Sequence, residues 1–187
     1  MATARRLNGT TQAFVERQKL FFVATAAPDG RVNVSPKGME SLRVMGENRI
    51  VWLNFSGSGN ETAAHLLEAN RMTLMWCAFE GDPMILRAYG SARTVHPGDD
   101  GWGEVASLFG DMSAKLSSRQ IFDMQVDLVQ SSCGTGVPLM DYAGERGENE
   151  LLPFFEDMGA DGVRDYWERK NTKSIDGRPT GIFDRET

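Results

Sequence analysis

The sequence predicts a mainly β protein with flanking helices, an α+β fold in which about six antiparallel strands form a small closed or partly split barrel. Apolar stretches rich in β-branched and aromatic residues alternate with tight-turn sequences, a pattern typical of hairpins. These connections are too short for the crossover that parallel strands need. Because an open sheet of this size would leave two unprotected edges, we expect the strands to curl and close.

Length and composition favour one soluble globular domain. The chain has 187 residues, of which 41% are hydrophobic and 25% charged, so disordered, collagen-like and coiled-coil classes are excluded. The net charge is −6 and no basic cluster interrupts the acidic chain, which excludes a nucleic-acid partner. No apolar run follows the first residues, and no stretch approaches the ~20 apolar residues that a bilayer crossing needs. We therefore expect no leader sequence, no membrane association and a cytoplasmic location.

The strand segments are recognised by apolar runs or by alternation of apolar and polar residues. They lie at residues 20–26, 31–37, 42–45, 49–55, 72–79, 84–95 and 121–130. The turns Ala27–Gly30, Gly46–Asn48 and Glu80–Pro83 connect them in pairs, because Gly, Pro, Asn and Asp favour the backbone angles of tight turns. Alternation is clearest in the last segment, where every second residue from Phe122 to Leu128 lies on one face.

Helical periodicity predicts helices before, between and after the strands. A leading amphipathic helix over Thr10–Lys19 buries Phe14 and Val15, and the Glu61–Asn70 segment carries an apolar stripe at helical spacing. Further helices are expected at residues 102–109, 148–158 and 161–170, followed by an extended tail over residues 171–187.

The segment from Gly57 to Thr62 is the first candidate binding site. It leaves a strand and opens a helix, where free backbone N–H groups, bare glycines and the hydroxyls of Ser58 and Thr62 suit an anion such as a phosphate. A dinucleotide fingerprint is excluded, because Thr62 stands where its third glycine belongs. The alternative is a flexible corner in which Asn60 is an ordinary helix cap.

The strand over residues 31–37 is the second candidate. We expect Val32 and Val34 to face the core, so that the polar residues line a groove beside the glycine loop. These polar residues are Arg31, Asn33, Ser35 and Lys37. Lys37 supplies the positive charge that an acidic protein needs to hold an anion, and Pro36 ends ladder pairing, which leaves neighbouring backbone groups free to meet a ligand. The alternative is a solvated face of a half-buried hairpin.

Cysteine and histidine offer little chemistry in this chain. Cys77 and Cys133 are too few for a disulfide framework or a four-thiolate zinc site, and Cys133 is expected to be a small packing residue. His65 is expected at the surface or as a helix cap. Since His96 is the only other histidine, we predict no metal site.

Several runs of the sequence resemble one protein family. These runs are Phe21–Thr25, Pro28–Gly38, Trp52–Thr62, Leu66–Arg71 and Leu86–Gly90. Over roughly residues 10 to 140 the chain resembles the pyridoxamine 5′-phosphate oxidase-related family of FMN-binding split-barrel proteins. The resemblance implies a six-stranded antiparallel split β-barrel over residues 1–140, with residues 141–187 as a helical C-terminal extension of the same domain. It also implies a homodimer with one FMN in each of two grooves at the interface.

The resemblance further implies a cofactor site built from three segments. The matching residues are Ser35, Pro36 and Lys37 for the isoalloxazine ring and ribityl chain, Leu53 and Asn54 for the ring, and Gly59, Asn60, Glu61 and Thr62 for the phosphate. The oxidase itself has an Arg–Lys pair within the loop that here reads Asn60, Glu61, Thr62. Its substrate-phosphate arginine and histidine have no counterpart here, so oxidation of pyridoxamine phosphate is not expected.

The resemblance implies a flavin-dependent oxidoreductase that uses FMN and acts on a small or planar substrate. The flavin performs the redox chemistry, and no side chain is assigned as a catalytic acid or base. Two alternatives remain open. The first is a non-catalytic flavin carrier or sensor. The second is a barrel that binds haem, with Met, Cys77, Cys133, His65 or His96 as the iron ligand.

Overall fold

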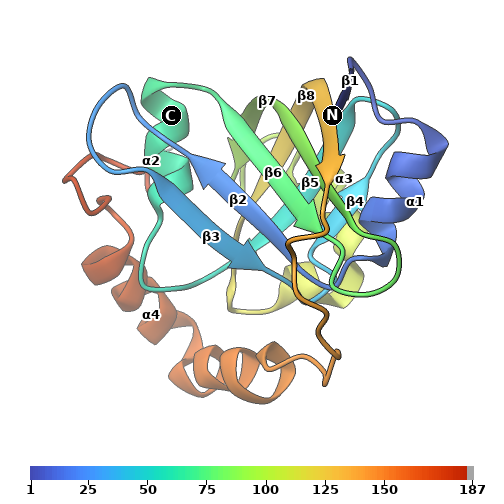
Figure 1. Cartoon of the computed structure of the whole chain (residues 1–187). Helices are drawn as coiled ribbons and strands as arrows, with labels where there is room; N and C mark the ends of the chain where they lie inside the picture. Colours follow the sequence, from blue (N-terminus) through green and yellow to red (C-terminus); the bar gives the residue numbers. More distant parts are fainter. Residues whose placement is uncertain (185–187) are drawn as a thin grey trace.

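The computed structural model describes residues 1–184 and contains one antiparallel sheet that curls into a half-barrel (Figure 1). Its strands are β1 (Ala2–Ala4), β2 (Phe21–Thr25), β3 (Asn33–Lys37), β4 (Leu42–Val44), β5 (Arg49–Phe55), β6 (Met72–Cys77), β7 (Met84–Val95) and β8 (Ser118–Cys133). Their order is β3-β2-β6-β7-β8-β5-β4, with β1 paired to the C-terminal half of β8. The end strands β3 and β4 are consecutive in the chain but do not pair, so the barrel is split between them. The last three residues of the predicted tail, 185–187, lie outside the described residues.

The predicted mainly β split barrel is confirmed, although the sheet has eight strands rather than about six. No pattern in the sequence predicts β1, because its three residues are exposed and join the sheet through backbone pairing with β8. β8 extends beyond the predicted segment 121–130 at both ends, where all of its residues except Cys133 are polar. Such ends show no alternation of apolar and polar residues, so the predicted strand is shorter than β8.

The helices pack around this sheet. They are α1 (Gly9–Arg17), α2 (Glu61–Glu68), α3 (Trp102–Ala106) and α4 (Leu152–Lys170), with a 3₁₀ segment over Ser107–Ala114 and a π-helical turn over Gly147–Leu151. α4 bends at Gly159, whose φ of 69° suits glycine, so the two predicted helices at 148–158 and 161–170 are halves of one bent element. Figure 1 shows α4 outside the sheet and the tail turning back beside the β2–β3 connection. No helix within residues 1–184 has the length and apolar character to cross a bilayer.

Side-chain alternation places the core inside the barrel. On β2 and on most of β6, every second side chain is buried. Trp52 of β5 is fully buried and stacks on Phe122 of β8 with ring centroids 4.5 Å apart, while Phe21 of β2 meets Trp52 edge-on at 6.0 Å. The predicted burial of Phe14 and Val15 on α1 is confirmed.

The predicted orientation of β3 is wrong. Val34 is 60% exposed, and Val32, which precedes the strand, is 69% exposed. The polar side chains turn inward instead; they are Asn33, Ser35 and Lys37. β3 is an edge strand, and within residues 1–184 no element covers its outer face. Alternation therefore predicted two faces correctly but assigned the wrong one to the interior.

Candidate functional site

β3, the end of β5 and the start of α2 line an open cavity of about 350 Å³. Its lining residues are Asn33, Ser35, Pro36, Lys37, Asn54, Gly57, Ser58, Gly59, Asn60, Glu61, Thr62 and Arg119. Asn33 donates a hydrogen bond from Nδ2 to Thr62 Oγ1 at 3.4 Å, which joins the two candidate segments directly. The structure therefore brings together every predicted cofactor residue except Leu53.

The start of α2 faces this cavity without a side-chain cap from residues 1–184. Asn60 occupies the N-cap position, but its Oδ1 accepts from Gln120 Nε2 at 2.7 Å and its Nδ2 donates to the Asn171 carbonyl at 3.5 Å. The alternative of an ordinary Asn60 cap is therefore wrong. Because the first N–H groups of a helix lack intrahelical partners, the first turn of α2 offers amides and a positive dipole end to an anion.

Two cationic side chains line the cavity, and within residues 1–184 neither of them forms an ion pair with a carboxylate. Arg119 is 3% exposed; its Nη1 donates to the Gly59 carbonyl at 3.0 Å, and its Nε has no partner within residues 1–184. Nζ of Lys37 lies 5.9 Å from the ring centroid of Trp52. Burial, together with the nearby charge of Arg119, lowers the pKa of Lys37 to about 8, and burial also lowers the pKa of Arg119. Cations in such surroundings are unfavourable unless an anion accompanies them.

Sequence reasoning missed Arg119. The predicted strand begins at Ile121, where apolar alternation starts, whereas β8 begins at Ser118 and carries Arg119 into the interior. Gln120 pairs with Asn54 in the β5–β8 ladder, which brings Arg119 next to the loop after β5. The signal in the sequence is a pair of polar residues directly before an alternating strand. That pattern is equally typical of a solvated turn.

The structure does not bring Leu53 to the other predicted residues. Successive residues of a strand point to opposite faces, so Leu53 turns away from the side that Asn54 occupies. Leu53 is 1% exposed and packs in a second core cluster with Val105 and Ile121. Asn54 does line the cavity, and its buried Oδ1 has no hydrogen-bond partner within residues 1–184. Asn54 therefore places a buried acceptor without a partner at the wall of the cavity.

His65 and Cys133 differ from their predicted environments. His65 is 1% exposed rather than at the surface, and its Nδ1 lies 3.0 Å from Oγ1 of Thr25 on β2. Cys133 is an exposed free thiol rather than a packing residue, with its Sγ 3.1 Å from Oγ1 of Thr135. Among the described residues, no three or more His, Cys, Asp or Glu side chains are grouped to hold a metal ion.

Known proteins match most of the chain. The model of the pyridoxamine 5′-phosphate oxidase family matches residues 7–133. The pyridoxamine 5′-phosphate oxidase family protein ustO of Aspergillus flavus is 32% identical over 177 residues, which cover 87% of this chain and 71% of that protein.

Solved structures share the fold at lower identity. HutZ of Vibrio cholerae, described as a haem storage protein, has a TM-score of 0.51 and 20% identity over 70% of this chain and 98% of its own. HupZ of Group A Streptococcus has a TM-score of 0.50 and 14% identity over 65% of this chain and 92% of its own. With the family match over residues 7–133 and the 32% identity to ustO, this chain belongs to the pyridoxamine 5′-phosphate oxidase family.

Proposed function

We propose that the protein is an FMN-binding flavoprotein, a flavin-dependent oxidoreductase acting on a small or planar substrate, and that the cavity between β3 and α2 holds the FMN phosphate. The observation that carries this proposal is the pair of cations, Lys37 and Arg119, that line the cavity and form no ion pair within residues 1–184. A phosphate dianion complements two such donors through charge-assisted hydrogen bonds. Membership of the pyridoxamine 5′-phosphate oxidase family supports the choice of a flavin.

The remaining groups around the cavity fit a flavin phosphate. Ser35, Ser58 and Thr62 carry hydroxyls, and Gly57 leaves the backbone of the loop open. The first turn of α2 adds uncapped amides, the arrangement by which helix starts bind phosphate. When bound, the flavin supplies hydride or electron transfer, and the protein binds and orients it.

The absorption spectrum of the purified protein tests this proposal. We expect a flavin spectrum that stays with the protein during gel filtration. After the flavin is removed, FMN should rebind more tightly than riboflavin, because riboflavin lacks the phosphate. Equal affinities would contradict a phosphate site, and a Soret band would favour the haem alternative. Reduction by a nicotinamide followed by reoxidation with a candidate substrate separates an enzyme from a carrier or sensor.

FMN affinity is expected to fall as the pH rises from 7 to 9. The pKa of Lys37 is lowered to about 8, so the side chain of the ligand-free protein is protonated at pH 7 and mostly neutral at pH 9. A phosphate dianion favours the protonated lysine, so above pH 8 binding must also take up a proton. The Kd should rise by roughly tenfold between pH 7 and 9. Flavin-fluorescence titrations at each pH measure it. A Lys37→Arg variant stays charged over this range, and if its pH profile is as steep as the wild-type profile, Lys37 is not the titrating group.

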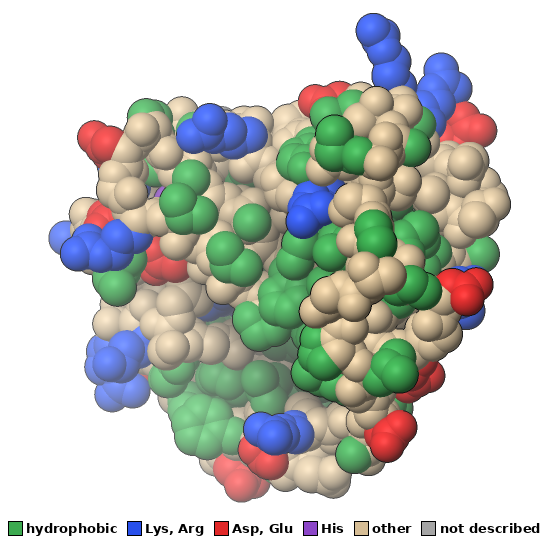
Figure 2. Space-filling view, in the orientation of Figure 1, with side chains coloured by type: hydrophobic (Ala, Val, Ile, Leu, Met, Phe, Trp, Pro, Cys, Tyr) green, Lys and Arg blue, Asp and Glu red, His purple; other side chains and the backbone are tan. Residues whose placement is uncertain are grey.

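We further propose a homodimer in which a second copy covers the outer face of β2, β3 and β6. Val34 is exposed there, and its neighbours across the ladders, Phe22, Ala24 and Met75, are partly exposed. Figure 2 views this face and shows hydrophobic side chains gathered on it. Contiguous apolar surface of this kind is typical of a protein interface. Because β3 also lines the cavity, a partner on this face would lie close to the flavin.

Val34→Asp is expected to convert the dimer to a monomer at micromolar concentration and to reduce its flavin content. A carboxylate placed in a buried apolar interface has no compensating partner, and an isolated buried charge is strongly unfavourable. Sedimentation velocity followed at a flavin wavelength reports both effects. Leu139→Asp, which changes a 79% exposed residue of the loop after β8, serves as the control. A wild-type monomer that carries a full complement of flavin would rule out an interfacial site.

A further inference from the structure

Residues 172–180 form a tight hairpin, the C-terminal hairpin, that packs against the start of α2 and the turn before β3. Lys173 pairs with Pro179 in an isolated antiparallel bridge. At its tip, the backbone N–H of Gly177 donates to the Ser174 carbonyl at 2.9 Å, which closes a four-residue turn.

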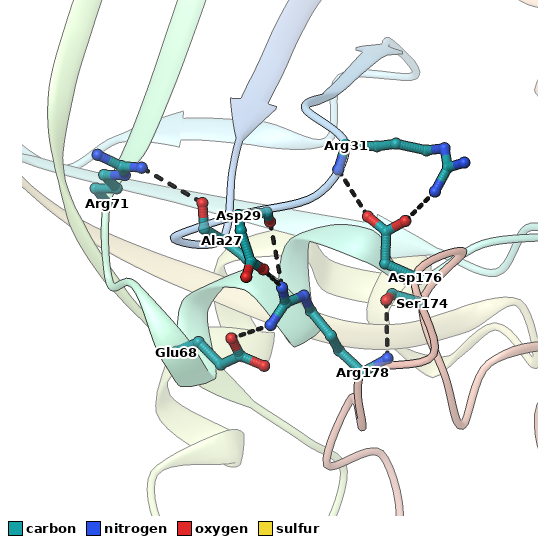
Figure 3. Close-up of polar contacts among 8 residues, drawn as sticks. All are labelled: Ala27, Asp29, Arg31, Glu68, Arg71, Ser174, Asp176 and Arg178. Carbon is teal, nitrogen blue, oxygen red and sulfur yellow. Dashed lines mark hydrogen bonds and ion pairs between the residues drawn. The ribbon is translucent and has the colours of Figure 1, made fainter.

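Ion pairs attach this hairpin to the turn before β3 and to the end of α2 (Figure 3). Asp176 accepts from the backbone N–H of Arg31 at 2.7 Å and pairs with the Arg31 guanidinium, at the turn that leads into β3. Arg178 is directed between Asp29 of the same turn and Glu68 at the end of α2, and it pairs with both. The hairpin therefore bridges the start of β3 and α2.

The tip of the hairpin also holds the acidic residue of the cavity lining, Glu61. The backbone N–H of Ile175 donates to both carboxylate oxygens of Glu61, to Oε1 at 3.0 Å and to Oε2 at 3.2 Å. A carboxylate free to approach a phosphate would repel it, since like charges in a partly buried site interact strongly. Fixed on Ile175, the same charge stays at the first turn of α2, where it is favourable for the helix dipole.

We propose that the C-terminal hairpin sets the anion affinity of the cavity by fixing the Glu61 carboxylate on the Ile175 amide, with Ile175 as the positioning residue. The identity of the anion, an FMN phosphate, rests on the proposed function. The effect is specific for the phosphorylated form of the flavin, because it acts through charge at the phosphate end. Asn171, directly before the hairpin, holds the same loop by donating from Nδ2 to the Gly57 carbonyl at 2.9 Å.

The turn geometry allows the Ile175 amide to be removed alone. Ile175 and Asp176 are the central residues, neither has a positive φ, and Gly177 follows at a φ of 81°. This combination is a type I turn followed by a left-handed glycine, as in three-residue hairpin loops. Proline is favoured at the first central position of a type I turn, so Ile175→Pro deletes one N–H while the turn is kept. The Ile175 side chain is 71% exposed, so Ile175→Ala, which keeps the N–H, is a matched control.

Isothermal titration calorimetry with FMN, riboflavin and inorganic phosphate tests the proposal on the flavin-free full-length protein. We expect Ile175→Pro to weaken FMN and phosphate about tenfold and to leave riboflavin unchanged, while Ile175→Ala binds all three like the wild type. Adding Glu61→Gln to Ile175→Pro removes the charge and should restore FMN affinity, which a general loss of structure would not allow.

The proposal is overturned if Ile175→Pro and Ile175→Ala bind FMN and phosphate equally, or if Glu61→Gln fails to rescue Ile175→Pro. The wild type could bind phosphate but not FMN, with phosphate binding weakened by Ile175→Pro and unchanged by Ile175→Ala. In that case the hairpin inference stands and the flavin proposal fails. If FMN binds to the wild type and equally well to Ile175→Pro, the flavin proposal stands and the hairpin inference fails. A wild-type protein that binds neither ligand overturns both.

Discussion

Replacing Arg119 with methionine is expected to weaken FMN binding by about 100-fold while the ligand-free protein stays as stable as the wild type or becomes more stable. Arg119 is buried and forms no ion pair with a carboxylate of residues 1–184, so without an anion the guanidinium bears a desolvation cost that methionine avoids. With the phosphate bound, charge-assisted hydrogen bonds of about 1.5–3 kcal/mol are lost. Calorimetric titration with FMN and thermal unfolding without ligand measure the two effects separately.

Arg164→Met is the matched control for this experiment. Arg164 lies on α4 with its side chain 65% exposed and paired with Glu168, so its removal should change neither the FMN affinity nor the unfolding temperature appreciably. If Arg119→Met lowered stability and left FMN affinity unchanged, Arg119 would be a structural residue, and the phosphate site would lose its main support.

Trp52→Ala is expected to lower the free energy of unfolding by about 3–5 kcal/mol, the largest loss of stability among the variants considered. Trp52 is fully buried, stacks on Phe122 and makes an edge-to-face contact with Phe21. Truncation to alanine therefore leaves a large cavity between β2, β5 and β8. For a protein of this size the unfolding temperature should fall by about 10 °C. Urea unfolding followed by far-ultraviolet circular dichroism measures the change.

Two variants calibrate the Trp52 result. Trp52→Phe keeps an aromatic ring and removes an indole N–H that has no partner within residues 1–184, so it should cost far less than Trp52→Ala. Phe154→Ala truncates a ring that is 54% exposed on α4 and should cost less still. Equal losses for Trp52→Ala and Phe154→Ala would mean that the Trp52 cluster is not the centre of the core.

Much of the site could be predicted because its signals are local. Glycines, hydroxyls and a helix start within Gly57–Thr62 indicate an anion site, and the polar residues of β3 do line the same cavity. The errors arise where one pattern fits two arrangements. Alternation on β3 cannot say which face is inside, and Val34 proved to be exposed because this edge strand has no covering layer within residues 1–184. On β5, successive side chains also point to opposite faces, so Leu53 packs in the second core cluster and away from the cavity.

Patterns along the chain were sufficient for the hairpins, the inserted helix, the helical character of residues 148–170 and the glycine loop, since each depends on residues that are close in sequence. Packing between distant segments decided the rest. Arg119 reaches Gly59 across 60 residues of sequence, and Ile175 meets Glu61 across 114. A buried charge and a hydrogen bond to a backbone amide produce no hydrophobic periodicity in the neighbouring sequence. These contacts therefore depend on the tertiary structure, in which the barrel and the tail bring the distant segments together.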